Sequence, residues 1–187
     1  MLEAIHISKA FDGKTVLNDV NLRVEGTVAV MAPSGTGKTT LLRILLGLEK
    51  PDAGTIRVTG TRMAAVFQED RLIEHMTALQ NLSLAAPDRK RTALLEHLES
   101  LGLSSEANQP VKIFSGGMKR RVAIARAIAC EPDMLLLDEP FSGLDDAMKV
   151  RAAEYIRTHM QGKDVMLVTH DREEANLLGA KEIIVLE

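Results

Sequence analysis

A glycine-containing loop with one lysine carries the clearest chemical signal in the sequence. It joins the apolar run Thr27–Met31 to a stretch with leucines at helical spacing. Glycines let backbone amides curl around phosphate oxygens, and a helix that follows adds the positive end of its dipole. We therefore expect a nucleoside triphosphate site rather than a chance glycine turn. Its expected nucleotide contacts are Ser34, Gly35, Thr36, Gly37, Lys38, Thr39 and Thr40.

Within this loop, two side chains have distinct expected roles. Lys38 can reach the β- and γ-phosphates, and Thr39 is placed to bind Mg²⁺. The pattern departs from the common phosphate-loop motif at its first position, where Ala32 stands instead of glycine.

An acidic pair, Asp138 and Glu139, ends the apolar run 134–137. Beside a phosphate site, the aspartate can hold Mg²⁺ while the next carboxylate polarises the attacking water, which are the needs of phosphoryl transfer. The alternative is an ordinary acidic turn after a strand, closed by Pro140.

His170 and the Ser115-Gly116-Gly117 turn are weaker signals. His170 follows the apolar run 165–168 and could contact a γ-phosphate, although a single histidine is more often a surface or capping residue. The serine-glycine turn opens an expected helix and could bind an anion. Its basic residues are more typical of a solvated or salt-bridged face than of a nucleic-acid groove, since no aromatic residues alternate with them. These basic residues are Lys119, Arg120, Arg121 and Arg126.

The elements that must position these groups alternate between strand and helix. Apolar and alternating runs predict strands at 2–8, 20–24, 27–31, 55–58, 64–67, 134–137, 165–168 and 183–186. Helical spacing is found at 38–46, 76–102, 115–129 and 146–160. This order predicts an α/β fold with a mostly parallel sheet, in which 78–129 form a helical insertion.

Composition limits the possible classes of protein. The 187 residues are 45% apolar with a net charge of -3, which suits one domain with one core and gives no support for broad neutralisation of nucleic-acid phosphates. The single cysteine, Cys130, excludes an internal disulfide framework. No secretory signal and no apolar run long enough for a bilayer are found, so we expect a soluble protein.

The order of the motifs resembles the nucleotide-binding domain of ABC ATPases over 2–186. The phosphate loop is followed by Gln68 after a strand, the turn 114–117, the acidic pair, the segment 142–145 and His170. The resemblance implies a P-loop NTPase core with a small antiparallel β subdomain and a helical signature subdomain. It also implies that Phe11 stacks on adenine, Gln68 contacts Mg²⁺ or water, Glu139 is the general base and His170 is the switch histidine.

In that family, two copies bind head to tail and enclose ATP between one phosphate loop and the partner's signature turn. The resemblance therefore implies an ATP-dependent homodimer in which Ser115, Gly116 and Gly117 contact the partner's nucleotide. It further implies permease subunits, an extracytoplasmic solute-binding protein, a place on the inner face of the cell membrane, and no nucleic acid. Phe114 and Met118 depart from the usual leucine and glutamine of the signature.

Segments 67–73 and 76–82 are most similar to the ATPases of nitrate, sulfonate and taurine importers. Two other classes remain as alternatives. Soluble ABC ATPases of DNA repair split this core with long coiled coils, and no heptad run of that length occurs here. A non-hydrolytic nucleotide sensor would be supported by loss of Lys38, Glu139 or His170, all of which are present.

Overall fold

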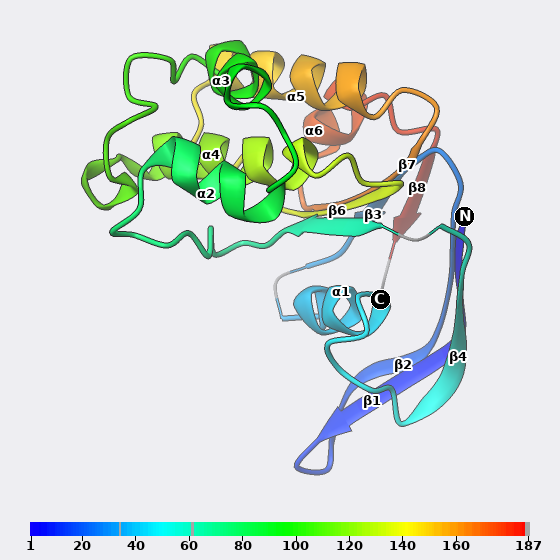
Figure 1. The fold of residues 1–187 in the computed structure, drawn as a ribbon. Coiled ribbons are helices and arrows are strands. Elements are labelled where there is room, and N and C mark those ends of the chain that lie inside the picture. The colour runs from blue at the N-terminus through cyan, green and yellow to red at the C-terminus, as the bar shows by residue number, and fades with distance from the viewer. Residues whose placement is uncertain (34, 61, 186–187) are drawn as a thin grey trace.

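The computed structural model describes residues 1–33, 35–60 and 62–185, which form two sheets and the helices packed against them (Figure 1). In chain order the elements are β1 (Leu2–Phe11), β2 (Lys14–Val24), β3 (Thr27–Met31), α1 (Lys38–Leu45), β4 (Ala53–Val58), β5 (Met63–Val66), α2 (Ala78–Ala85), α3 (Arg91–Ser100), the 3₁₀ turn η1 (Val111–Ile113), α4 (Gly116–Ala129), β6 (Met134–Asp138), α5 (Asp146–His159), β7 (Asp164–Thr169), α6 (Arg172–Leu177) and β8 (Glu182–Val185).

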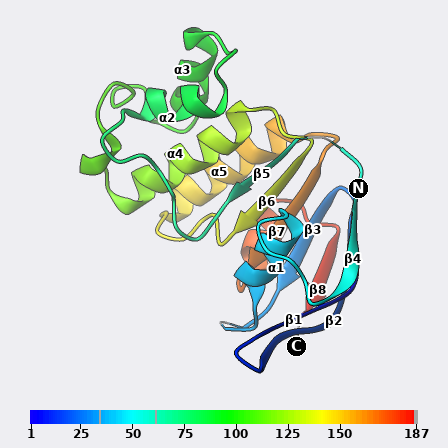
Figure 2. The same ribbon diagram turned by 60° about the horizontal axis from the view of Figure 1, so that its bottom comes forward.

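The larger sheet is parallel and has the order β5-β6-β7-β3-β8 among the described residues, which Figure 2 shows in sequence across the molecule. Its inner strand β6 is buried along its whole length, as expected for a strand covered on both faces. Because all strands run the same way, their carboxyl ends meet at one edge of the sheet, where α/β proteins bind ligands. The expected α/β fold with a mostly parallel sheet is confirmed.

Two hydrophobic cores lie on opposite faces of this sheet. Alternation along β6 assigns Leu135 and Leu137 to one core and Met134 and Leu136 to the other. The first core packs under α2 to α6, and the second packs under α1 and the antiparallel sheet (Figure 1). The sheet therefore carries the phosphate-loop helix on one side and the helical layer on the other.

The smaller sheet has the order β2-β1-β4 and is antiparallel. Its strands β1 and β2 extend beyond the expected 2–8 and 20–24, because register shifts interrupt the regular alternation on which the prediction depends. At Gly54 in β4 an added Cβ would lie 2.4 Å from the carbonyl oxygen of His6, so only glycine permits this close approach.

The helical region differs from the expectation in two places. The single helical stretch 76–102 is divided into α2 and α3, because Pro87 has no amide donor and moves the preceding Ala86 out of the helical conformation (φ -136°, ψ 66°). The short helix α6 was not expected. The last residue of the expected strand 183–186 lies outside the described residues.

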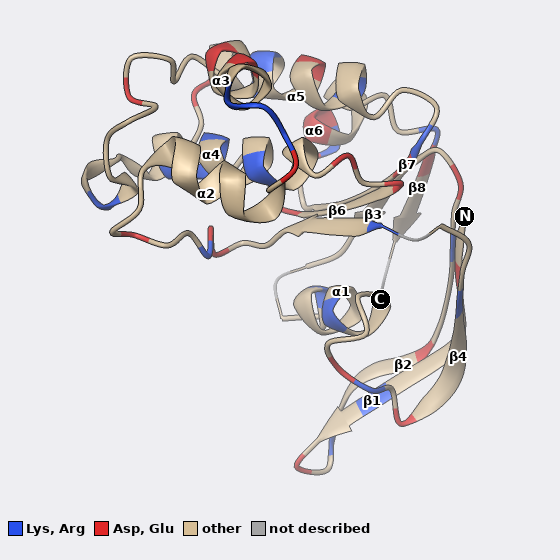
Figure 3. Cartoon of the chain, viewed as in Figure 1, with Lys and Arg blue, Asp and Glu red and all other residues tan. Residues whose placement is uncertain are grey.

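Charged residues of both signs are mixed along the described elements (Figure 3). No helix in the described part of the chain is long and apolar enough to cross a membrane.

Candidate functional site

A cavity of about 470 Å³ lies at the carboxyl edge of the parallel sheet. It brings together side chains that are far apart in the sequence, and its lining consists of Val16, Gly35, Gly37, Lys38, Thr39, Thr40, Gln68, Asp138, Glu139 and His170. A larger cavity of about 980 Å³ lies at the opposite edge, near the starts of β3 and β7, and contains none of the motif residues. The chemistry therefore points to the smaller cavity.

Lys38 is the first residue of α1, and its side chain is 8% exposed. Its ammonium donates to the carbonyl oxygens of Ala32 (2.8 Å) and Pro33 (3.1 Å) and lies 3.8 Å from the Glu139 carboxylate. The preceding Gly37 has φ +85°, and a Cβ there would come within 2.7 Å of Val16. Glycine is thus required both for the turn and for the contact between loop and β2.

The other loop residues frame this lysine. Thr36 donates its hydroxyl to the Pro33 carbonyl (2.8 Å), and Gly35 has a positive φ of +86° that glycine adopts without strain. Ser34, an expected nucleotide contact, lies outside the described residues.

Asp138 ends β6 and faces the start of α1. Its carboxylate accepts a hydrogen bond of 2.9 Å from the Thr39 hydroxyl. Burial raises the pKa of Asp138, the nearby Glu139 carboxylate raises it further, and the Thr39 hydrogen bond acts in the opposite direction. A buried carboxylate beside a hydroxyl oxygen is the donor set that Mg²⁺ prefers, so these two residues fit that ion.

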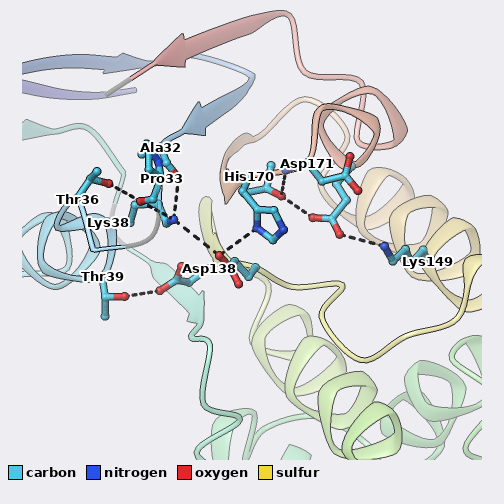
Figure 4. A network of polar contacts seen from close by, with 12 residues as sticks. Ala32, Pro33, Thr36, Lys38, Thr39, Asp138, Lys149, His170 and Asp171 are labelled. Atoms are coloured by element: carbon cyan, nitrogen blue, oxygen red, sulfur yellow. Dashed lines mark hydrogen bonds and ion pairs between the residues drawn. The ribbon is translucent and has the colours of Figure 1, made fainter. Parts of the chain in front are cut away.

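Glu139 follows directly and adopts the left-handed conformation, with φ +47°. Non-glycine residues adopt it rarely, and such strain is often found at functional sites. The turn is fixed by a hydrogen bond of 2.9 Å from the Glu139 amide to the Val168 carbonyl in β7. It directs the carboxylate toward Lys38 and His170, whose Nδ1 lies 3.4 Å away (Figure 4).

Gln68 lines the cavity after β5, and two arginines of α4 hold the segment around it. Arg120 donates to the carbonyls of Phe67 (2.6 Å) and Gln68 (2.5 Å), and Arg126 donates to those of Asp70 (3.0 Å) and Arg71 (2.8 Å). The sequence favoured a solvated or salt-bridged face for these basic residues. Arg120 does form an ion pair with Asp70, but it is only 5% exposed, and its guanidinium holds the backbone of Gln68 in the cavity wall. No local pattern predicts this role, because it depends on α4 packing against β5.

Thr36 of the loop and two further groups of expected nucleotide contacts do not line this cavity. Phe11, at the end of β1, is 43% exposed, with the Lys9 ammonium 5.0 Å from its ring centre. The Ser115 to Gly117 turn opens α4, where the Ser115 hydroxyl caps the helix by accepting from the Met118 amide (3.3 Å). A Cβ on Gly117 would lie 2.9 Å from the Gly143 carbonyl, so this glycine permits close contact with the segment 142–145.

Curated relatives match nearly the whole chain. An aliphatic sulfonates import ATP-binding protein, SsuB 1, of Nocardia farcinica is 42% identical over 97% of this chain and 76% of its own length. Its counterpart in Rhodococcus jostii is 38% identical over 100% of this chain and 79% of its own length. An Fe(3+) ions import ATP-binding protein, FbpC 1, of Rhodococcus jostii is 40% identical over 93% of this chain. The chain spans only 56% of that iron-import relative.

A solved structure has the same fold. The dimeric post-hydrolysis state of the ATP-binding cassette MJ0796 bound to ADP and Pi superposes with a TM-score of 0.91 at 29% identity, covering 100% of this chain and 94% of that one. The family described as ABC transporter matches residues 17–142, which include the phosphate loop, Gln68, the signature turn and the acidic pair. From its motifs, its fold and these relatives, this chain is a member of the ABC transporter family of ATP-binding proteins.

Proposed function

We propose that this chain binds and hydrolyses ATP to drive solute import through separate permease subunits. The observation that carries the proposal is the convergence of Lys38, Asp138, Glu139 and His170 on one cavity from three strand ends. The import proteins among its relatives support the direction of transport.

The chemistry follows from the positions of the side chains. Lys38 binds the β- and γ-phosphates, and loop amides contact the remaining phosphate oxygens. Glu139 accepts a proton from the water that attacks the γ-phosphorus, the bond to the leaving ADP oxygen breaks, and phosphate is released. His170, beside Glu139, contacts the γ-phosphate and helps orient it.

Thr39 and Asp138 would hold Mg²⁺, with Gln68 on the same cavity wall. When bound, the ion neutralises phosphate charge. No cluster of three or more histidine, cysteine or acidic residues that could hold a metal is found in the described ranges. The pair Thr39 and Asp138 suits Mg²⁺, because proteins often bind this ion through one or two carboxylates and the substrate phosphates.

The assembly follows from the separation of the two nucleotide-contacting parts. Residues 1–187 act as one ATPase domain with a helical insertion at 78–129, and two copies enclose ATP between a phosphate loop and the partner's Ser115 turn. The dimeric cassette with the same fold supports this arrangement. The pair lies on the inner face of the membrane through its permease and receives solute from an extracytoplasmic binding protein. The sulfonate importers among its relatives favour a sulfonate-like organic anion as the solute.

The decisive experiment is Glu139→Gln. The amide keeps the shape of the side chain but cannot accept a proton, so we expect ATP hydrolysis to fall by at least about 100-fold. ATP affinity should be equal or higher, because a carboxylate no longer repels the γ-phosphate. Phosphate release and calorimetric titration with Mg-ATP measure the two effects. Turnover near the wild-type rate would exclude Glu139 as the base.

A further inference from the structure

A buried carboxylate outside the nucleotide cavity is unexplained by the proposed chemistry. Glu174 lies in the short helix α6 and is 7% exposed. Burial of a carboxylate is costly unless its charge and hydrogen bonds are satisfied. Here one oxygen accepts a hydrogen bond of 2.6 Å from the Thr169 hydroxyl, and the other lies 3.4 Å from the Lys149 ammonium.

Thr169 is the last residue of β7 and is fully buried. Its hydroxyl donates to Glu174 and accepts from the amide of Asp171 at 3.1 Å. The Thr169 hydroxyl, which precedes His170 in the chain, is therefore bonded to residues that follow His170. The His170 side chain itself is 69% exposed, and Glu139 is its one polar contact among the described residues. Its position thus depends on how well the backbone at 169–171 is fixed.

The other partner of Glu174 connects this turn to α5. Lys149 lies in the first turns of α5, and its amide donates to the Asp145 carbonyl at 2.8 Å. Asp145 is the last residue of the loop that follows Glu139. Its side chain caps α5 by accepting a hydrogen bond from the Met148 amide. Glu139 and His170 are in direct contact, and the contacts of Glu174 with Thr169 and Lys149 join the turn that carries His170 to α5 (Figure 4).

We propose that Glu174 is a positioning residue, which fixes the Thr169 hydroxyl and so holds His170 against Glu139 for hydrolysis. This proposal rests on the proposed ATPase function. Among the described residues, the hydrogen bond and ion pair of Glu174 go to Thr169 and Lys149, neither of which lines the nucleotide cavity, so its effect should reach the rate of hydrolysis and leave nucleotide binding unchanged. A purely structural role would instead lower fold stability and ATP affinity together.

The test compares disruptive and conservative substitutions in the full chain. Thr169→Val and Glu174→Ala remove the hydrogen bond, whereas Thr169→Ser and Glu174→Gln keep a donor and an acceptor. We expect kcat to fall about tenfold or more in the disruptive pair, as small displacements of catalytic groups do. The conservative pair should stay within about threefold of wild type, and KM for ATP within about twofold in all four.

Glu173→Ala is the matched control, because it removes the same charge from the adjacent, exposed position of α6. Thermal melting and affinity for a non-hydrolysable ATP analogue with Mg²⁺ are measured for every variant. Wild-type kcat in the disruptive pair, equal losses in the conservative pair, or loss of analogue affinity would each overturn the proposal. A wild-type chain that hydrolyses no ATP would instead overturn the proposed function, so the two failures are distinguishable.

Discussion

At the scale of single residues, Asp138 illustrates a conflict between stability and function. Its pKa is raised in the fold, so the protonated form favours folding, and its stabilising contribution is lost as pH rises through the folded pKa. Near neutral pH the ionised Asp138 therefore lowers the stability of the protein when no ligand is bound. Its charge is nevertheless what a divalent cation requires.

We therefore expect Asp138→Asn to raise stability near pH 7.5 by about 1 kcal/mol, or about 2–4 °C in Tm. The amide oxygen can still accept from Thr39. The same change should remove the stabilisation that Mg-ATP gives over ATP alone. Thermal melting with and without Mg²⁺ measures both effects, and Glu96→Gln at an exposed position of α3 is the control. A lower Tm in the absence of nucleotide would contradict this account of Asp138.

At the scale of elements, the contact between α3 and α5 contains a buried polar pair. His97 of α3 is 8% exposed, and its Nδ1 lies 2.7 Å from the hydroxyl of Tyr155 in α5. Burial lowers the pKa of His97 to about 4 from 6.5, and the nearby His159 and Arg89 act in the same direction against Glu131. The neutral imidazole therefore belongs to the folded state.

This lowered pKa predicts acid sensitivity. Protons bind His97 more readily in the unfolded chain, so the stability contributed by neutral His97 is present above pH 6.5 and is lost as pH falls toward 4. The loss is at most about 3 kcal/mol. His97→Gln should flatten this part of the pH profile, whereas His75→Gln at an exposed position should not. Urea unfolding between pH 7 and pH 4 measures it, and equal profiles in wild type and His97→Gln would contradict the assignment.

How much the sequence could predict depends on whether the signal is local. The strand Thr27–Met31, the helix that begins at Lys38 and the buried strand β6 carry their patterns within a few residues, and the structure has them as expected. The break at Pro87 was missed because the helical pattern over 76–102, with its leucine stripe at 94–101, suggested one helix. Helix α6 is too short for a periodic signal, with only six residues. The role of Arg120 depends on contacts more than 50 positions away, which no local pattern contains.

The residues of the candidate site also differ in whether a local pattern could predict them. The sequence order brought Lys38, Asp138, Glu139 and His170 into one hypothesis, and the fold places all four around one cavity. Their individual catalytic roles stay predictions. No motif pointed to Glu174, because its proposed positioning role depends on the contact of α6 with Thr169 at the end of β7.

At the scale of the whole molecule, the nucleotide cavity and the Ser115 turn are separate within one chain. We expect a mainly monomeric protein without nucleotide, and a dimer with Mg-ATP when Glu139→Gln blocks hydrolysis. Adding Ser115→Arg should abolish this dimer and leave nucleotide binding by the monomer intact. Ser104→Arg at an exposed position is the control. Light scattering measures the mass, and an ATP-dependent dimer that survives Ser115→Arg would exclude this turn from the shared site.

The left-handed backbone at Glu139 also bears on which sequences can persist at this position. Glycine and asparagine adopt φ near +47° at lower cost than glutamate, whereas β-branched residues raise that cost. A population of genes selected only for folding would therefore drift toward glycine or asparagine here. Selection for turnover is the force that would retain the carboxylate.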